Sequence, residues 1–273
     1  MDAKRAVRGA LIGAAAPVAE RAFRERPRVR VLAFHDTPPM KEGELRERLR
    51  RLADRCAVVS LVGAFERTQL DPERLNVALT FDDGLKEHHT VAARVLDDLG
   101  LAGTFFVPTG ALDLEGQTAV AFSRHGLRRS RTFEFMSTRD LRELAEHPLF
   151  ELGGHTHSHP DLGETDDFAV EIVEPKQALE RVSGKPVRWF AYPFGSPLNL
   201  SPRSVDAIRL AGYETAFTIV PAYWSASTDP HLVGRDALSL DDSARSWEGF
   251  LRGGYDALSA FKYRRPLAAL QSR

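Results

Sequence analysis

The chain has 273 residues, of which 43% are hydrophobic and 27% are charged, enough to bury one large core or two modest ones. Its 37 basic and 38 acidic side chains give a net charge of -1, which removes any global electrostatic case for nucleic acid or an acidic membrane surface as a partner. The single cysteine, Cys56, excludes an intramolecular disulfide and a cysteine-based zinc site, and its apolar surroundings indicate a buried, inert thiol.

The N-terminus carries early positive charges followed by the short alanine-rich stretch ALIGAAAPVA and then Glu20. This stretch is at the weak end of the ~7–15 apolar residues of a secretory signal. We therefore expect residues 1–27 to form a helical or flexible segment of a cytoplasmic protein, with a secreted or membrane-associated protein as the alternative. No stretch reaches the roughly 18 apolar residues of a membrane-spanning helix.

From residue 28 onward, apolar runs rich in β-branched and aromatic residues alternate with helical patterns. Strands are predicted at 29–35, 57–62, 75–81, 103–108, 150–155, 187–193, 214–220 and 236–240. Helices are predicted over 42–53, 89–100, 137–148, 168–184 and 201–213, with Pro175 expected to interrupt the fourth of them. This alternation favours one α/β domain over 28–273, with parallel strands that form either a barrel or an open doubly wound sheet.

The connection between about 111 and 136 is long and rich in arginine. It contains Arg124, Arg128, Arg129 and Arg131. Long connections of this kind are often functional, so we expect either a lid or substrate-facing loop or a plain solvated loop.

Two adjacent carboxylates, Asp82 and Asp83, directly follow a strand-like run in LTFDDG. Neighbouring like charges disfavour ionisation of each other, so a cation, hydrogen-bond donors or a metal must compensate them. A turn or a helix cap is the common structural use of Asp-Asp-Gly. A catalytic pair remains the alternative, in which one carboxylate binds a metal and the other acts as a general base.

Histidines follow a later strand in the stretch GGHTHSHP. His155 and His159 are four residues apart, and one turn of helix would place both imidazoles on the same side. One aspartate and two histidines form a three-ligand site of the kind that leaves a position open for water. His157 lies between them and is expected to point elsewhere.

A third strand-like run ends in FAYPFG, at 190–195. The order TFDDG, then His-Thr-His-Ser-His, then this proline–aromatic–glycine loop resembles the polysaccharide deacetylases of carbohydrate esterase family 4, the NodB-homology domain. The resemblance covers roughly residues 29–240, and FAYPFG is similar to the subgroup of poly-N-acetylglucosamine deacetylases. It implies a distorted (β/α) barrel and a divalent metal, zinc first and cobalt or nickel as alternatives.

The resemblance also implies roles for individual residues. Asp82 matches the catalytic base of the family and Asp83 its metal ligand, while His155 and His159 match the two histidine ligands. The backbone N–H of Phe194 matches the donor that helps to bind the oxyanion. Apart from the resemblance, aromatic faces can stack on sugar rings, so Tyr192, Tyr223 and Trp224 are expected to contact the sugar, whereas Trp189 lies in a strand and is expected in the core.

The sequence departs from the family pattern at two positions. Ala191 replaces the arginine that orients the base in many members, and Arg235 is the candidate for the missing charge unless it pairs with Asp236. The usual C-terminal histidine acid is also absent. In the resembling subgroup an equivalent histidine follows the first strand, which points to His35 as the general acid, unless this residue only caps its strand end.

The function expected from these residues is the metal-dependent hydrolysis of N-acetyl or O-acetyl groups on a sugar, oligosaccharide or polysaccharide. A deacylase or deformylase of a small or lipid-linked glycan precursor is one alternative. A non-catalytic carbohydrate-binding relative and a protein whose metal is only structural are the others. A purely structural site needs no spare carboxylate, so the pair Asp82 and Asp83 argues against the last two.

Overall fold

The computed structural model describes residues 27–271. Within this range eight strands form one parallel sheet, in which β7, β6, β5, β4, β3, β1 and β8 are successive neighbours and β2 pairs with β3. The strands are β1 Val29–Phe34, β2 Ala57–Val58, β3 Asn76–Phe81, β4 Gly103–Val107, β5 Phe150–Gly154, β6 Trp189–Ala191, β7 Thr215–Phe217 and β8 Asp236–Leu238.

The sheet curls until its two ends approach each other. The segment just before β8 runs beside β7, where the Val233 N–H donates to the Ala216 carbonyl at 3.0 Å and the Thr218 N–H donates to the Val233 carbonyl at 2.8 Å. This bridge joins the outermost strands through backbone hydrogen bonds. The predicted alternatives are therefore resolved in favour of the distorted (β/α) barrel.

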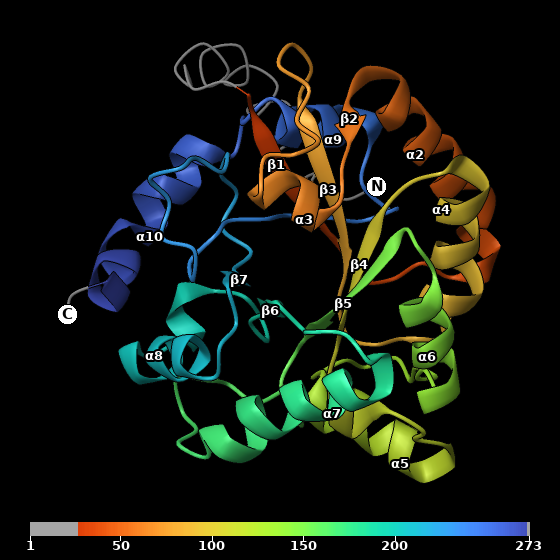
Figure 1. Cartoon of the computed structure of the whole chain (residues 1–273), viewed down its shortest axis with the longest axis vertical. Helices are drawn as coiled ribbons and strands as arrows, with labels where there is room; N and C mark the ends of the chain where they lie inside the picture. Colours follow the sequence, from red (N-terminus) through yellow and green to blue (C-terminus); the bar gives the residue numbers. More distant parts are fainter. Residues whose placement is uncertain (1–26, 272–273) are drawn as a thin grey trace.

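Helices surround the outside of the curled sheet (Figure 1). The prediction that Pro175 interrupts the helix at 168–184 is confirmed, because a π-helical turn at Ala169–Val173 precedes α7, which has Pro175 in its first turn. Serine caps open α6 and α8 as expected. The helices are α2 Glu42–Arg55, α3 Leu61–Phe65, α4 Arg94–Leu99, α5 Gly116–Ala121, α6 Thr138–Glu146, α7 Glu174–Ser183, α8 Pro202–Leu210, α9 Ala244–Leu251 and α10 Asp256–Gln271.

The strands bury both of their faces, as parallel strands do. Side chains on the outer face pack against the helices in the largest apolar cluster, which includes Leu32 and Leu79. The alternate side chains, among them Ala78, Phe106 and Phe217, form a smaller cluster inside the barrel. This inner cluster fills the barrel beneath the loops that follow the strands, so these loops pack on a close-packed apolar core.

The prediction of a strand over 57–62 was wrong beyond its first residues. Only Ala57–Val58 pair with β3, and the apolar run continues as helix α3. The side chain of Ser60 accepts a hydrogen bond from the Gly63 N–H at 2.9 Å, which starts the helix at this point. A short apolar run is compatible with a strand or a helix by pattern alone, and here the serine cap favours the helix.

The expectations for the N-terminus fall almost entirely on residues outside the described range. Among the described residues, no helix combines the length and apolar character that crossing a membrane requires.

Candidate metal centre and active site

Strained loop residues gather at the carboxyl ends of the strands. Seven non-glycine residues in the described range have positive φ, and five of them lie in the loops of this site. Such conformations cost about 1–3 kcal/mol each and persist where the surrounding structure imposes them. The five residues are Asp83, Arg128, Thr156, His159 and Phe194.

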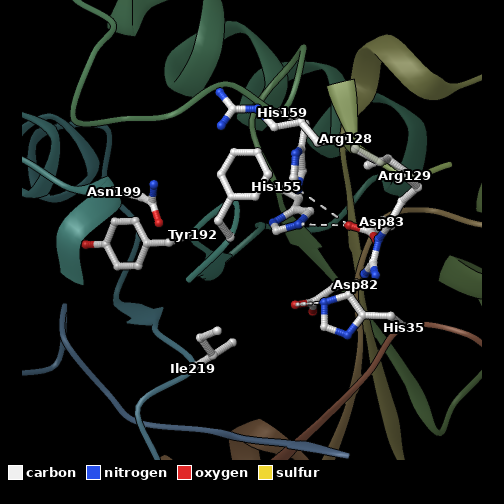
Figure 2. Close-up of a pocket in the computed structure, with 12 residues that line it drawn as sticks. His35, Asp82, Asp83, Arg128, Arg129, His155, His159, Tyr192, Asn199 and Ile219 are labelled. Atoms are coloured by element: carbon white, nitrogen blue, oxygen red, sulfur yellow. Dashed lines mark ion pairs between the residues drawn. The ribbon is translucent and has the colours of Figure 1, made fainter. Parts of the chain in front are cut away.

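Three of the predicted residues converge on one point (Figure 2). Asp83 Oδ1 lies 3.5 Å from Nε2 of His155 and 3.5 Å from Nε2 of His159. All three side chains are almost completely buried. A tetrahedral zinc ion with bonds of ~2.0–2.2 Å would separate its ligand atoms by roughly 3.3–3.6 Å, so these two separations fit such an ion.

The orientation of both histidines also fits a metal. Nδ1 of His155 donates to the Ala191 carbonyl at 2.7 Å, and Nδ1 of His159 donates to the Gly126 carbonyl at 3.1 Å. These bonds fix the tautomer that leaves each Nε2 with a free lone pair directed at Asp83. The backbone thus holds the imidazoles in the form that binds a cation.

The expected helical turn between the two histidines is not present. Residues 155–160 form an irregular bend after β5, with Thr156 and His159 both at positive φ. The hydroxyl of Thr156 accepts the His159 N–H at 3.0 Å and so stabilises the bend. His157 points away, as expected, and hydrogen bonds to the Thr109 hydroxyl at 3.0 Å.

Burial determines how these groups titrate. Burial and the neighbouring His155 together lower the pKa of His159 to about 4. Burial alone would raise the pKa of Asp83, but the neighbouring His155 and the other nearby imidazoles hold it far below its ordinary value. At neutral pH the site therefore combines an ionised carboxylate with a neutral His159 imidazole, as a divalent metal requires.

Asp82, the neighbour of Asp83, has a different partner. Its two carboxylate oxygens accept bonds from the two terminal nitrogens of Arg235, each at 2.7 Å. Burial alone would raise the pKa of Asp82, but Arg235 and the nearby His155 lower it below its ordinary value. Asp82 is thus kept ionised without being part of the three-residue cluster.

Arg235 is itself held from several sides. Its Nε donates to the Thr218 carbonyl at 3.2 Å and one terminal nitrogen donates to the Thr80 hydroxyl at 3.0 Å. Its guanidinium lies over the rings of Phe106 and Phe217, on top of the inner core. It does not pair with Asp236, which was the alternative interpretation. Arg235 directly precedes β8, and the side chains of Arg235 and Asp236 point to opposite faces of the sheet, where Asp236 meets Arg30.

His35 lies at the edge of the same site. Its Nε2 is 3.9 Å from Asp82 Oδ2, and its side chain is 28% exposed. The buried His88 donates its Nε2–H to the His35 carbonyl and so fixes the end of β1. His88 is itself completely buried.

These residues line a pocket of about 460 Å³. Tyr192 and Phe194 belong to its wall, and the Phe194 ring packs against the His159 ring with a centroid separation of 4.7 Å. The long arginine-rich connection also reaches the pocket, through Leu127, Arg128 and Arg129. Asn199 and Ile219 complete the lining, and no motif in the sequence identified these two residues.

Tyr223 and Trp224 do not line the pocket. The Tyr223 ring lies under the Arg30 guanidinium at 4.1 Å, and Trp224 packs against Phe65 with a centroid separation of 5.0 Å. We therefore do not assign either residue to the sugar site. Trp189 is buried in the inner core, as expected from its strand.

A second cluster of possible ligands consists of His89, Asp140 and Glu143. Its carboxylates already have partners, because Asp140 caps α6 and pairs with Lys86 at 2.6 Å, and Glu143 pairs with Arg139 at 2.9 Å. The pocket cluster is therefore the stronger metal candidate.

Known structures share this architecture. The polysaccharide deacetylase BC0361 from Bacillus cereus is similar with a TM-score of 0.65 and 22% identity over 82% of this chain and 69% of that one. A de-N-acetylase from Aggregatibacter actinomycetemcomitans gives 0.66 and 18% over 82% and 100%, and IcaB from Ammonifex degensii gives 0.64 and 21% over 82% and 97%. At these identities the likeness concerns the fold. No curated protein sequence matches the chain significantly.

The sequence itself decides the family. A sequence model of the polysaccharide deacetylases matches residues 70–216, which is more than half of the chain and includes both aspartates, both histidines and the FAYPFG loop. The resemblance predicted from the motifs is confirmed: the chain belongs to the polysaccharide deacetylase family, whose members are metal-dependent hydrolases that remove acetyl groups from acetylated carbohydrates.

Proposed function

We propose that this chain hydrolyses N-acetyl groups of an acetylated glycan with zinc held by Asp83, His155 and His159. The observation that carries the proposal is that two adjacent carboxylates have different partners. Asp83 faces the Nε2 atoms of both histidines, where a metal would bind, while Asp82 is ionised, buried and paired with Arg235 beside them. A site that served only to bind a metal would not need a second carboxylate of this kind.

The bound metal would polarise the acetyl carbonyl and lower the pKa of a water molecule to about 7. Asp82 takes a proton from the attacking water as the new C–O bond forms. The Phe194 N–H donates to the carbonyl oxygen as that oxygen gains negative charge, an effect of about 3 kcal/mol for one backbone donor. The C–N bond then breaks, and His35 supplies the proton that the departing sugar nitrogen needs.

The backbone at Phe194 supports its role as a donor. Phe194 has φ +59° and is followed by Gly195 at φ +61°. A Cβ at Gly195 would lie 2.9 Å from the Ile219 nitrogen, so only glycine fits at this turn. This tight turn holds the Phe194 ring against His159 and fixes the loop beside the metal ligands.

Two observations argue against a non-catalytic carbohydrate-binding relative. That alternative rested on the missing arginine of the FAYPFG loop, where Ala191 stands, and on the missing C-terminal histidine. Arg235 reaches Asp82 from the late strand region, and His35 reaches the same carboxylate from the end of β1. Both side chains thus come from other parts of the chain than in the family pattern.

The test is acetate release from N-acetylglucosamine oligomers by the protein as purified, after chelation, and after zinc, cobalt or nickel is restored. We expect release that disappears with the chelator and returns with metal, most strongly with zinc. Release that survives complete chelation, or no release with a full complement of metal, would contradict the proposal.

A further inference from the structure

Two consecutive arginines line the catalytic pocket. Arg128 and Arg129 follow the π-helical turn Phe122–Gly126 in the long connection between β4 and β5, and both side chains are exposed. Figure 2 shows that they diverge, with Arg129 reaching toward Asp83. The positive φ of Arg128, 53°, accompanies this divergence.

Arg128 has no acidic partner among the described residues. Its guanidinium lies over the Phe194 ring at 4.6 Å from the centroid. Arg131, from the same connection, differs because it pairs with Glu87 at 3.2 Å and lies 3.9 Å from Asp36. Among the residues that the structure describes, the N–H donors at the edge of the Arg128 guanidinium have no hydrogen-bond partner, while its face packs on an aromatic ring.

The pocket has no spare negative charge to balance these arginines. Asp82 is engaged by Arg235, and Asp83 faces the two histidine nitrogens with which it would hold the metal. Arg129 lies 4.0 Å from Asp83 Oδ2, which is too long for a hydrogen bond. The pocket thus presents two guanidinium groups that no carboxylate of its lining binds directly.

We propose that the acetylated glycan taken by this site is anionic, and that Arg128 binds a carboxylate or phosphate group on the reacting sugar or on its immediate neighbour. The inference rests on the proposed function and adds the substrate class. Arginine presents a planar fork of donors that matches both anions, whereas a neutral hydroxyl group uses only part of it. The contact between Arg128 and Phe194 places this anion site beside the reacting acetyl group.

The experiment compares acetate release from three substrates with the zinc-restored protein. They are the neutral N-acetylglucosamine dimer, a disaccharide of N-acetylglucosamine and glucuronic acid, and N-acetylglucosamine 6-phosphate. We expect one anionic substrate to exceed the neutral dimer by about tenfold in kcat/KM, chiefly through a lower KM that rises with salt. The better of the two anionic arms identifies the anion as carboxylate or phosphate.

Substitution tests the assignment to Arg128. In Arg128→Gln we expect the ratio of kcat/KM between the anionic and the neutral substrate to fall about tenfold. The matched control is Arg124→Gln, an exposed arginine of the same connection that does not line the pocket, and it should keep the wild-type ratio. An unchanged ratio in Arg128→Gln, or a wild-type preference for the neutral dimer, would overturn the inference.

A binding measurement separates this inference from the proposed function. Calorimetry follows the binding of glucuronic acid and of glucose 6-phosphate to the zinc-loaded wild type and to Arg128→Gln. If no substrate is hydrolysed with any metal, the proposed function fails, while anion binding that depends on Arg128 still upholds the anion site. Binding that Arg128→Gln does not weaken would overturn the anion site even if the neutral dimer is hydrolysed.

Discussion

Arg235 and Asp236 are consecutive in the chain, yet each belongs to a different buried arginine–aspartate pair. Arg235 meets Asp82 with two hydrogen bonds of 2.7 Å at the catalytic pocket. Asp236 faces the other way and meets Arg30 with atoms 3.2 and 3.5 Å apart. All four side chains are almost completely buried, so burial does not distinguish the two pairs.

The second pair is divided. Arg30 also donates to Asp256, the first residue of α10, at 2.5 Å. Within the described part of the chain, Nε of Arg30 and Oδ2 of Asp236 make no hydrogen bond. Burial, only partly offset by Arg30, raises the pKa of Asp236 to about 7, whereas the pKa of Asp82 lies below its ordinary value. Arg235 donates two hydrogen bonds to one carboxylate and keeps Asp82 ionised. Arg30 divides its donors between Asp236 and Asp256, and the pKa of Asp236 rises.

Removal of Arg235 should have the largest effect of the predictions drawn from this comparison. In Arg235→Met, burial of Asp82 loses the largest of the charges that offset it, so the pKa of Asp82 rises and less base is ionised at a given pH. We expect a loss of about 100-fold in kcat/KM at neutral pH and an acid limb of the pH profile that moves to higher pH.

Arg235→Lys serves as the control, because it restores one charge and should recover part of the rate. A pH profile of Arg235→Met with the wild-type acid limb would refute the role of this arginine.

The corresponding change in the other pair should affect stability and not catalysis. Arg30→Met leaves Asp236 without its cation, but this carboxyl already takes a proton readily. We expect a loss of about 1–3 kcal/mol in the free energy of unfolding, with kcat/KM within a factor of about three of wild type. Denaturant titration and acetate release on the same preparations check this, and a catalytic loss as large as that of Arg235→Met would erase the contrast.

The pH dependence of stability should reveal Asp236. Its pKa is about 7 when folded and about 3.9 when unfolded, so between these values the folded state binds the additional proton. Stability from this group is therefore greatest at low pH and is lost as pH rises toward 7. We expect Asp236→Asn to flatten the fall of the melting temperature between pH 5 and 7.5, and an unchanged slope would show that Asp236 stays ionised throughout.

The smallest expected effect concerns the thiol of Cys56, which is buried and, among the described residues, forms no ion pair with an arginine. Burial raises the pKa of its thiol to about 11. We expect alkylation by iodoacetamide at pH 8 to be much slower for the folded chain than for the chain in denaturant. Similar rates in the two states, measured by mass spectrometry, would show that this thiol is accessible.

The sequence predicted the parts of the site that short motifs encode. Asp82 and Asp83 end a strand, and the histidine loop follows another strand, so parallel topology alone brings them to one edge. The bend at Thr156 was not predictable from spacing, because its positive φ is imposed by contacts within the folded loop. For Arg235 two interpretations stayed open, a partner for Asp82 or a pair with Asp236. Asp82 and Arg235 are far apart in sequence, and only the folded sheet, in which β1 lies between β3 and β8, brings them together.

Two aromatic residues, Tyr223 and Trp224, show that residue type and a loop-like sequence do not suffice to predict a contact with substrate. Tyr223 and Trp224 stand in a loop-like sequence, yet both pack near the start of β1, with Trp224 paired to Val29. Arg128 and Arg129 were predicted to belong either to a substrate-facing loop or to a solvated one. Their position in the pocket agrees with the first of these expectations. For the two aromatic residues and the two arginines alike, contacts between distant parts of the chain determine whether the side chain reaches the pocket.

The most direct test of the account is acetate release and zinc content measured together on Asp82→Asn, with Asp83→Asn for comparison. Asp82→Asn should keep about one zinc per chain and lose at least about 100-fold in rate, because the base is removed while the ligands remain. Asp83→Asn should lose both zinc and activity. An Asp82→Asn protein that still releases acetate at the wild-type rate, or that loses its zinc as Asp83→Asn does, would contradict the division of labour between the two aspartates.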